Sequence, residues 1–210
     1  VVVDRKGREI PIDEAVWQNR GKGGGGFFTR GGSPDPISQT MIISGMLSTK
    51  TGTSGIYLTK IDLFFSTKDA SLPVTVELHE VDSISGGITA KVVPFSRVIV
   101  PASDINTSED GTAATPVYFP SPVYLTDGME YAVVIIPGGT NPNYNVFTAV
   151  LGEEDIATGS RVTEQPATGV LYISANMRSW TPVQNEDLKF TAYYAEFDKS
   201  QVGNLIVKNE

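Results

Sequence analysis

Short apolar runs alternate with polar turns along most of this chain. In VTVELHEV (residues 74–81), the apolar Val74, Val76 and Leu78 alternate with the polar Thr75, Glu77 and His79, as in a strand with one buried face. Turn residues separate this run from similar ones, and such spacing predicts an all-β fold. The other predicted strands cover residues 42–47, 57–65, 92–100 (interrupted by Pro94), 117–119, 123–125, 131–136, 145–150, 170–174 and 188–197.

The run YAVVII (131–136) is apolar on both faces, which predicts a central strand with both faces covered. Gly86-Gly87 marks a hairpin, and Asp127-Gly128 marks a tight turn before the central strand. We therefore expect an antiparallel β-sandwich, jelly-roll-like, over residues 41–198. Helix is expected only as single turns, at residues 13–19 and at residues 101–107 with Ser103 as its cap.

Residues 1–40 differ from the rest because glycine, proline and polar residues dominate them. Such a segment buries too little apolar area to offset its ordering entropy, so we expect an extended N-terminal arm that is fixed only against a partner. Its bulky apolar pair, Phe27 and Phe28, is the expected partner contact. Residues 199–210 are expected to form a C-terminal extension. The chain lacks an initiator methionine, so we expect it to be processed or cut from a longer protein.

Composition narrows the classes of function. The net charge is −8 and the pI about 4.7, which disfavours binding to nucleic acid or to an anionic membrane surface. The chain has no cysteine, so disulfides, thiolate catalysis and cysteine-bound metals are excluded. No apolar run approaches the roughly 18 residues of a membrane-spanning helix.

His79 is the chain's single histidine and the first candidate for chemistry. It shares the polar face of its predicted strand with Thr75 and Glu77, so we expect an exposed surface histidine and not a general base. Gly21, Gly23 and Gly26 have the GxGxxG spacing of a dinucleotide-binding loop. Because neither the strand nor the helix that such a loop needs is predicted beside them, we expect a linker and no cofactor.

Acidic residues provide two further candidates. Glu153, Glu154 and Asp155 form one cluster and Glu186 and Asp187 another, but a glycosidase needs two carboxyl groups held at a set distance in a cleft. Both clusters fall at predicted turns, so we expect no catalytic pair. Calcium could be bound by loop oxygens, but no D-x-D-x-D-G run is present and we expect no metal site. The acids considered for calcium are Asp104, Glu109, Asp110 and Asp127.

Four aromatic residues could form a platform for sugar rings, as on carbohydrate-binding β-sandwiches. They are Trp17, Trp180, Tyr193 and Tyr194. The competing interpretation is that Trp180 and one of the tyrosines cap the core. The stretch SWTPVQNED (179–187) is expected to be a loop or bend, because Pro182 breaks regular pairing.

An ordered series of short motifs runs through the strand-rich region. They are DPISQT (35–40), YLTKIDLFFSTKD (57–69), PVTVEL (73–78), SPVYLTDGMEYAVVI (121–135), LGEED (151–155) and WTPVQNEDLKF (180–190). In their order and spacing, residues 35–198 resemble a domain repeated in large virion structural proteins of contractile-tailed bacteriophages, associated with the tail, baseplate or fibres. The resemblance implies a β-sandwich building block with no known active site. The chain departs from it near residues 82–88, where SISGGI forms the turn, and at His79, where an arginine-like residue is expected.

These observations lead to one expected function and one alternative. We expect a non-enzymatic virion component of the tail or baseplate region, which contacts other virion proteins and copies of itself. The alternative is a carbohydrate-binding module or receptor-binding tip, in which Trp180 and Tyr193 contact a glycan. An enzyme would require two acidic side chains converging in a pocket.

Overall fold

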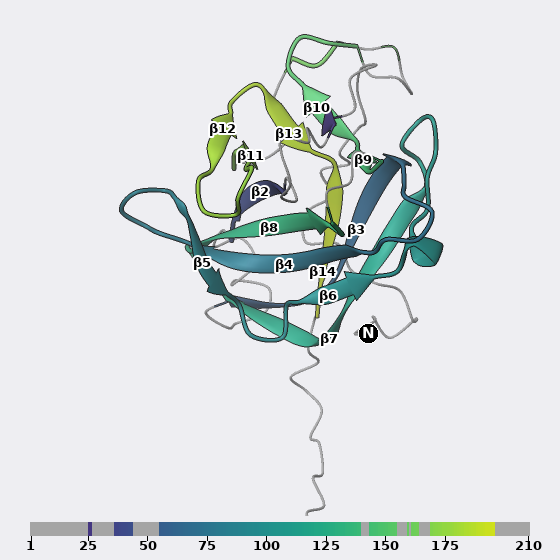
Figure 1. Ribbon diagram of the computed structural model, residues 1–210. Coiled ribbons are helices and arrows are strands. Elements are labelled where there is room, and N and C mark those ends of the chain that lie inside the picture. The colour runs from purple at the N-terminus through teal and green to yellow at the C-terminus, as the bar shows by residue number, and fades with distance from the viewer. Residues whose placement is uncertain are drawn as a thin grey trace, which may run out of the picture.

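The computed structural model describes residues 25–26, 36–43, 55–139, 143–154, 159, 161–163 and 169–195. This part of the chain is all-β, as expected, and its antiparallel sheets are curled (Figure 1). The helical turn predicted within 101–107 is present as the 3-10 helix η1 (Ala102–Asp104). Ser103 does not cap it, because Pro101 holds the N-cap position and no side-chain cap bond forms.

Three antiparallel sheets contain all the described strands. The seven-stranded sheet has the order β12 (Thr181–Val183), β11 (Leu171–Ile173), β2 (Ile37–Ile42), β8 (Glu130–Pro137), β4 (Val74–Val81), β5 (Ile88–Val92), with β6 (Val98–Val100) also on β4. The five-stranded sheet has the order β1 (Gly25–Gly26), β9 (Asn145–Val146), β3 (Gly55–Thr67), β14 (Phe190–Tyr194), with β7 (Ala114–Thr126) also on β3. The third sheet pairs β10 (Thr148–Val150) with β13 (Glu186–Leu188).

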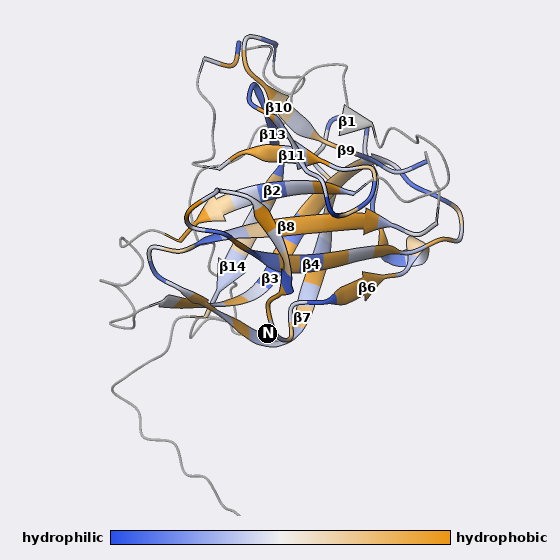
Figure 2. Ribbon diagram, turned by 60° about the vertical axis from the view of Figure 1, so that its left-hand side comes forward, coloured by the Kyte–Doolittle hydropathy of each residue, from blue (hydrophilic) through white to orange (hydrophobic). Residues whose placement is uncertain are grey.

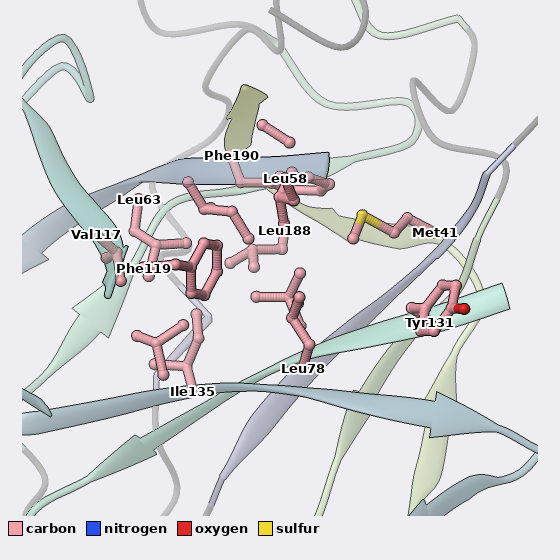
Figure 3. Close-up of a cluster of buried hydrophobic side chains, with 14 of the residues drawn as sticks. Met41, Leu58, Leu63, Leu78, Val117, Phe119, Tyr131, Ile135, Leu188 and Phe190 are labelled. Atoms are coloured by element: carbon pink, nitrogen blue, oxygen red, sulfur yellow. The ribbon is translucent and has the colours of Figure 1, made fainter. Parts of the chain in front are cut away.

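The two large sheets contribute side chains to one buried core (Figure 3). Leu58 and Leu63 of β3 and Phe119 of β7 meet Leu78 of β4 and Ile135 of β8 within it. Alternation explains this arrangement, because every second residue of each strand points into the shared core. Burial of this apolar area is the main favourable contribution to folding.

The predicted central strand is confirmed. β8 lies between β2 and β4 in the seven-stranded sheet, and its residues from Tyr131 to Ile135 are all buried. Figure 2 shows that β8 is hydrophobic over most of its length. Both of its faces are covered, since Val133 and Ile135 join the main core while Ala132 and Val134 belong to a second apolar cluster.

Both predicted turns are confirmed. The hairpin between β4 and β5 closes at Gly86, whose φ of +68° is readily adopted only by glycine and whose amide donates to Asp82 O at 2.8 Å. The turn between β7 and β8 contains Gly128, with φ +76°. The Gly128 amide donates to Ile43 O at 2.6 Å, which ties this turn to the end of β2.

Several predicted boundaries are wrong. β2 covers Ile37–Ile42, so it begins before the predicted start at residue 42, and the expected division after residue 40 falls inside a strand. Residues 44–47 of the predicted strand lie outside the described residues. Gly25–Gly26, placed in the expected arm, pair with Asn145 and Val146 of the same chain. Phe27, Phe28 and the predicted helical turn at 13–19 lie outside the described residues, as do residues 199–210.

The predicted strands 117–119 and 123–125 are one strand, β7, although Pro116, Pro120 and Pro122 lie in it. Lys60 of β3 pairs with Tyr118 of β7, and Leu58 of β3 pairs with Val123 of β7. Between these two pairs β7 contains more residues than β3, so β7 bulges there. Proline lacks an amide donor and is tolerated at bulges and edges. Among the described strands β7 pairs with β3 alone, which makes it an edge strand.

The C-terminal prediction of one strand over 188–197 is also wrong. The chain forms β13 and β14 instead, separated by Lys189. The expected loop 179–187 contains β12 and the start of β13, and Pro182 is accommodated because β12 ends the strand order of its sheet.

Candidate functional site

The single histidine is buried, so its predicted exposure is wrong. His79 is 5% exposed and Glu77, two residues before it on β4, is 2% exposed. Alternation along β4 correctly assigned the two residues to the face opposite the core residue Leu78. That second face is buried as well, and it includes an apolar group that we call the outer cluster. It contains Val81, Ile88, Ala132 and Val134, with Ile136, Tyr172 and Trp180 packed against it.

Both ring nitrogens of His79 have polar neighbours. Nδ1 lies 2.8 Å from the Thr89 carbonyl oxygen on β5, and Nε2 lies 3.1 Å from Glu77 Oε2. Arg97 Nε donates to the other carboxylate oxygen, Glu77 Oε1, at 2.7 Å. A carbonyl oxygen can only accept, so Nδ1 carries a proton. Among the described residues, these contacts join β4 to β5 and to the turn that holds Arg97.

The acidic residues take structural roles in the described part of the chain. Asp187 is buried and accepts from Gln39 Nε2 at 3.1 Å, while Glu186 accepts from the Thr148 hydroxyl. The backbones of Glu154 and Arg161 form an isolated antiparallel β-bridge, and Asp155 lies outside the described residues. Within the described ranges, no group of three His, Asp or Glu side chains is placed to hold a metal ion. No helix there is long and apolar enough to span a bilayer.

Trp180 and Tyr193, the expected glycan contacts, are not brought together. Trp180 is half-buried and packs against the outer cluster of the seven-stranded sheet. Tyr193 lies on β14 of the five-stranded sheet, between the core residues Ala192 and Tyr194, and therefore points away from the main core. The two residues thus lie on different sheets, on faces that do not join. Trp17 lies outside the described residues, and Tyr194 is buried in the core.

Tyr193 belongs instead to a set of tyrosines on the outward face of β3, β7 and β14. We call this set, with the Lys60 and Asp62 side chains among it, the tyrosine face. Its tyrosines are Tyr57, Tyr118, Tyr124 and Tyr193. Sequence analysis identified only Tyr193, although Tyr118 and Tyr124 each stand beside core residues in the alternation of β7, which is the signal that would have found them.

An ion pair organises the tyrosine face. Lys60 Nζ lies 3.2 Å from Asp62 Oδ1 and 3.9 Å from the centre of the Tyr193 ring. The Tyr193 hydroxyl donates to Asp62 Oδ2 at 2.9 Å. Tyr57 and Tyr124, paired across β3 and β7, have ring centres 5.1 Å apart. The charges of Lys60 and Asp62 compensate each other within this set of aromatic side chains.

A second surface feature lies at the edge of the other large sheet. β5 and β6 both pair with β4, and residues 93–97 between them form what we call the edge bulge. Phe95 there is 70% exposed and has a φ of +65°, a left-handed conformation that costs a bulky residue energy. Ser96 is fully buried and its hydroxyl donates to Val93 O at 2.7 Å, which fixes the turn. Ile99 of β6 is 63% exposed on the same edge.

No protein-family model matches the chain, and no curated protein matches it.

Proposed function

We propose that this chain is a non-enzymatic structural component of a contractile-tailed phage virion, in the tail, the baseplate or its fibres. We also propose that its curled sheets form a jelly-roll-like β-sandwich. In this role the protein would act through contacts with other virion proteins and with copies of itself. It would need no cofactor.

One observation supports the proposal: the motifs that resemble the virion domain supply strands that build the core, except LGEED, whose described residues are exposed. DPISQT leads into β2, YLTKIDLFFSTKD forms β3 and PVTVEL forms most of β4. SPVYLTDGMEYAVVI contains the turn from β7 to β8, and WTPVQNEDLKF covers β12 and β13. The motifs thus specify a framework, as expected for a building block.

The edge bulge supports an assembly role. Phe95 keeps a strained conformation while its ring is mostly exposed, and Ile99 adds an exposed apolar side chain on the same edge. Strain in a native structure persists where the surroundings enforce it, and it often marks a functional position. Exposed aromatic residues are also enriched at protein interfaces. We therefore propose the edge bulge as a contact with a neighbouring virion subunit, beside the contact expected at Phe27 and Phe28.

The carbohydrate-binding alternative receives less support. It required Trp180 and Tyr193 on one platform, and they lie on different sheets. Trp180 packs against the outer cluster, which agrees with a role in covering the sheet.

Mass spectrometry and immunogold electron microscopy of purified phage particles test the proposal. The chain should be recovered with the particles in a fixed ratio to the other tail proteins, and gold should label the tail or baseplate. Particles that lack the chain, or label confined to the head, would contradict the proposal.

A further inference from the structure

The edge bulge and β6 carry large apolar side chains that the fold itself leaves exposed. Phe95 and Ile99 are both mostly exposed, and Ile99 lies on β6 at the outside of the seven-stranded sheet (Figure 1). In the described part of the chain, β6 pairs with β4 alone, so its other side is a free edge. Exposed aromatic and aliphatic side chains on a rigid sheet are typical of surfaces that contact another protein.

Arg97, also in the edge bulge, is fixed by a buried carboxylate. Its Nε donates to Glu77 Oε1 at 2.7 Å, and Glu77 Oε2 in turn lies 3.1 Å from His79 Nε2. The Arg97 side chain is 64% exposed and that of Glu77 is 3% exposed, so the guanidinium group reaches from the buried carboxylate to the surface. Its terminal nitrogens carry further N–H donors, which suit a carboxylate. Arg97 therefore presents a fixed positive charge at this edge.

The chain that leaves the same edge carries the opposite charge. β6 ends at Val100 and η1 follows it, with Asp104 exposed and accepting from the Ser103 hydroxyl at 2.8 Å. Arg97 thus precedes Ile99 along the chain, and Asp104 follows it. When two such edges run antiparallel, the positive end of each meets the negative end of the other and the apolar middles meet. The edge is therefore complementary to a second copy of itself.

The neighbouring edge of the molecule is less suited to a contact of this kind. β6 lies close to β7, the edge strand of the five-stranded sheet. β7 contains Pro116, Pro120 and Pro122, and proline on an edge strand prevents another strand from pairing with it. On this side of the molecule, the edge bulge and β6 thus remain as the place where a second copy can pack.

We propose that a second copy of this chain packs against the edge bulge and β6 about a two-fold axis near Ile99. The β6 strands of the two copies run antiparallel, Arg97 of each copy meets Asp104 of the other, and Phe95 is covered. Because the chain has a net charge of −8, a contact between copies requires cations to meet acids, and this arrangement does so. The inference rests on the proposed function, since it identifies the neighbouring subunit at the edge bulge as a copy of the chain.

Sedimentation velocity of the full chain, from about 1 μM to about 0.5 mM, tests the proposal. We expect the wild type to form a dimer reversibly. Phe95→Gly removes the ring and also relieves the left-handed φ of +65°, so the fold is kept while the dimer Kd should rise about tenfold. Asp104→Lys should raise the Kd by a similar factor, because it reverses a charge that Arg97 meets.

A matched control separates position from charge. Glu153→Lys makes the same change of charge at an exposed residue just after β10, which lies far from β6 in both views (Figures 1 and 2). This variant should leave the dimer Kd within about twofold of the wild type. Circular dichroism would establish that each variant retains its strands.

Cysteine cross-linking tests the two-fold geometry. The chain has no cysteine, so Ile99→Cys creates a single thiol near the proposed axis. A short bismaleimide should link two copies of this variant at least about tenfold faster than two copies of Ile84→Cys, because a formed contact raises the effective concentration of the thiols. Ile84 is a stringent control, since at 95% exposure it is more accessible than Ile99.

Three results would each overturn the proposal. The first is a wild type that stays monomeric throughout the series. The second is a dimer that Phe95→Gly and Asp104→Lys weaken no more than Glu153→Lys does. The third is an Ile99→Cys variant that links no faster than Ile84→Cys. A monomeric chain that is recovered with phage tails would contradict this inference alone, whereas a dimeric chain that is missing from the particles would contradict the proposed function alone.

Discussion

Glu77 is the residue on which the buried polar group of β4 depends. Its carboxylate bonds both His79 and Arg97, so Glu77→Gln removes the negative charge that both partners face. We expect the free energy of unfolding to fall by about 2–3 kcal/mol, since the cost of leaving a buried polar group without its charged partner is of this size. Urea titration measures it. Glu80→Gln is the matched control: Glu80 pairs with the exposed Lys91, so its loss should cost under about 0.5 kcal/mol. Equal effects of the two variants would contradict this role of Glu77.

Asp82 makes the hairpin between β4 and β5 sensitive to acid. Hydrogen bonds from the Ser85 backbone amide, the Ser85 hydroxyl and the Ile84 amide lower the pKa of Asp82 below its ordinary value of 3.8. The folded state thus favours the carboxylate, which stabilises the protein above the unfolded pKa, and this stabilisation is lost as the pH falls through the lowered pKa. We expect the Tm difference between wild type and Asp82→Asn to be largest at neutral pH and to shrink in acid, as followed by calorimetry from neutral to acidic pH. A constant difference would argue against this assignment.

Among the secondary-structure elements, the strands predicted best from the sequence are those with one clear pattern of apolar residues. Residues 74–79 alternate without interruption and start β4, which has the predicted bounds, while the doubly apolar run 131–136 forms the central part of β8. β2 was misplaced because Ser38, Gln39 and Thr40 are polar yet fully buried. Gln39 bonds Asp187 and Thr40 bonds Val170, both far away in the sequence, and no local pattern reveals such partners.

The candidate sites were predicted less well than the strands. Alternation placed His79 on the correct face of β4, but it could not show that this face is buried as well. The tyrosine face unites residues of three strands that are distant in the sequence, so only Tyr193 was identified. At the edge bulge, the sequence predicted only an interruption at Pro94. The conformation of Phe95 could not be predicted, because it depends on the buried Ser96 and on the hydrogen bonds of Ser96 to neighbouring backbone.

Gly169, just before β11, packs so closely against Thr40 of β2 that we expect this position not to tolerate a larger residue. A Cβ atom on Gly169 would lie 1.8 Å from Thr40 O and 2.4 Å from Thr40 C, so backbone would have to move. We expect Gly169→Ala to destabilise the protein by about 3 kcal/mol, as for overpacked interiors. Gly87→Ala is the control: its Cβ would meet only the Ser85 hydroxyl, at 3.3 Å, and chemical denaturation should detect little change. Unaltered stability of Gly169→Ala would show that this contact is looser than described.

In the whole molecule, the two large sheets share one core, and each carries one of the two surface features described above. The tyrosine face lies on the five-stranded sheet and the edge bulge on the seven-stranded sheet. In the proposed function, the edge bulge contacts a neighbouring subunit.

In the proposed function, the protein acts through contacts between subunits in a phage virion. A cryo-electron microscopy map of the intact tail and baseplate is the decisive test. We expect density for this fold in the tail or baseplate, with Phe95 and Ile99 buried against a neighbouring subunit. A map that accounts for every tail and baseplate density without this fold, or that leaves both side chains facing solvent in every copy, would contradict it.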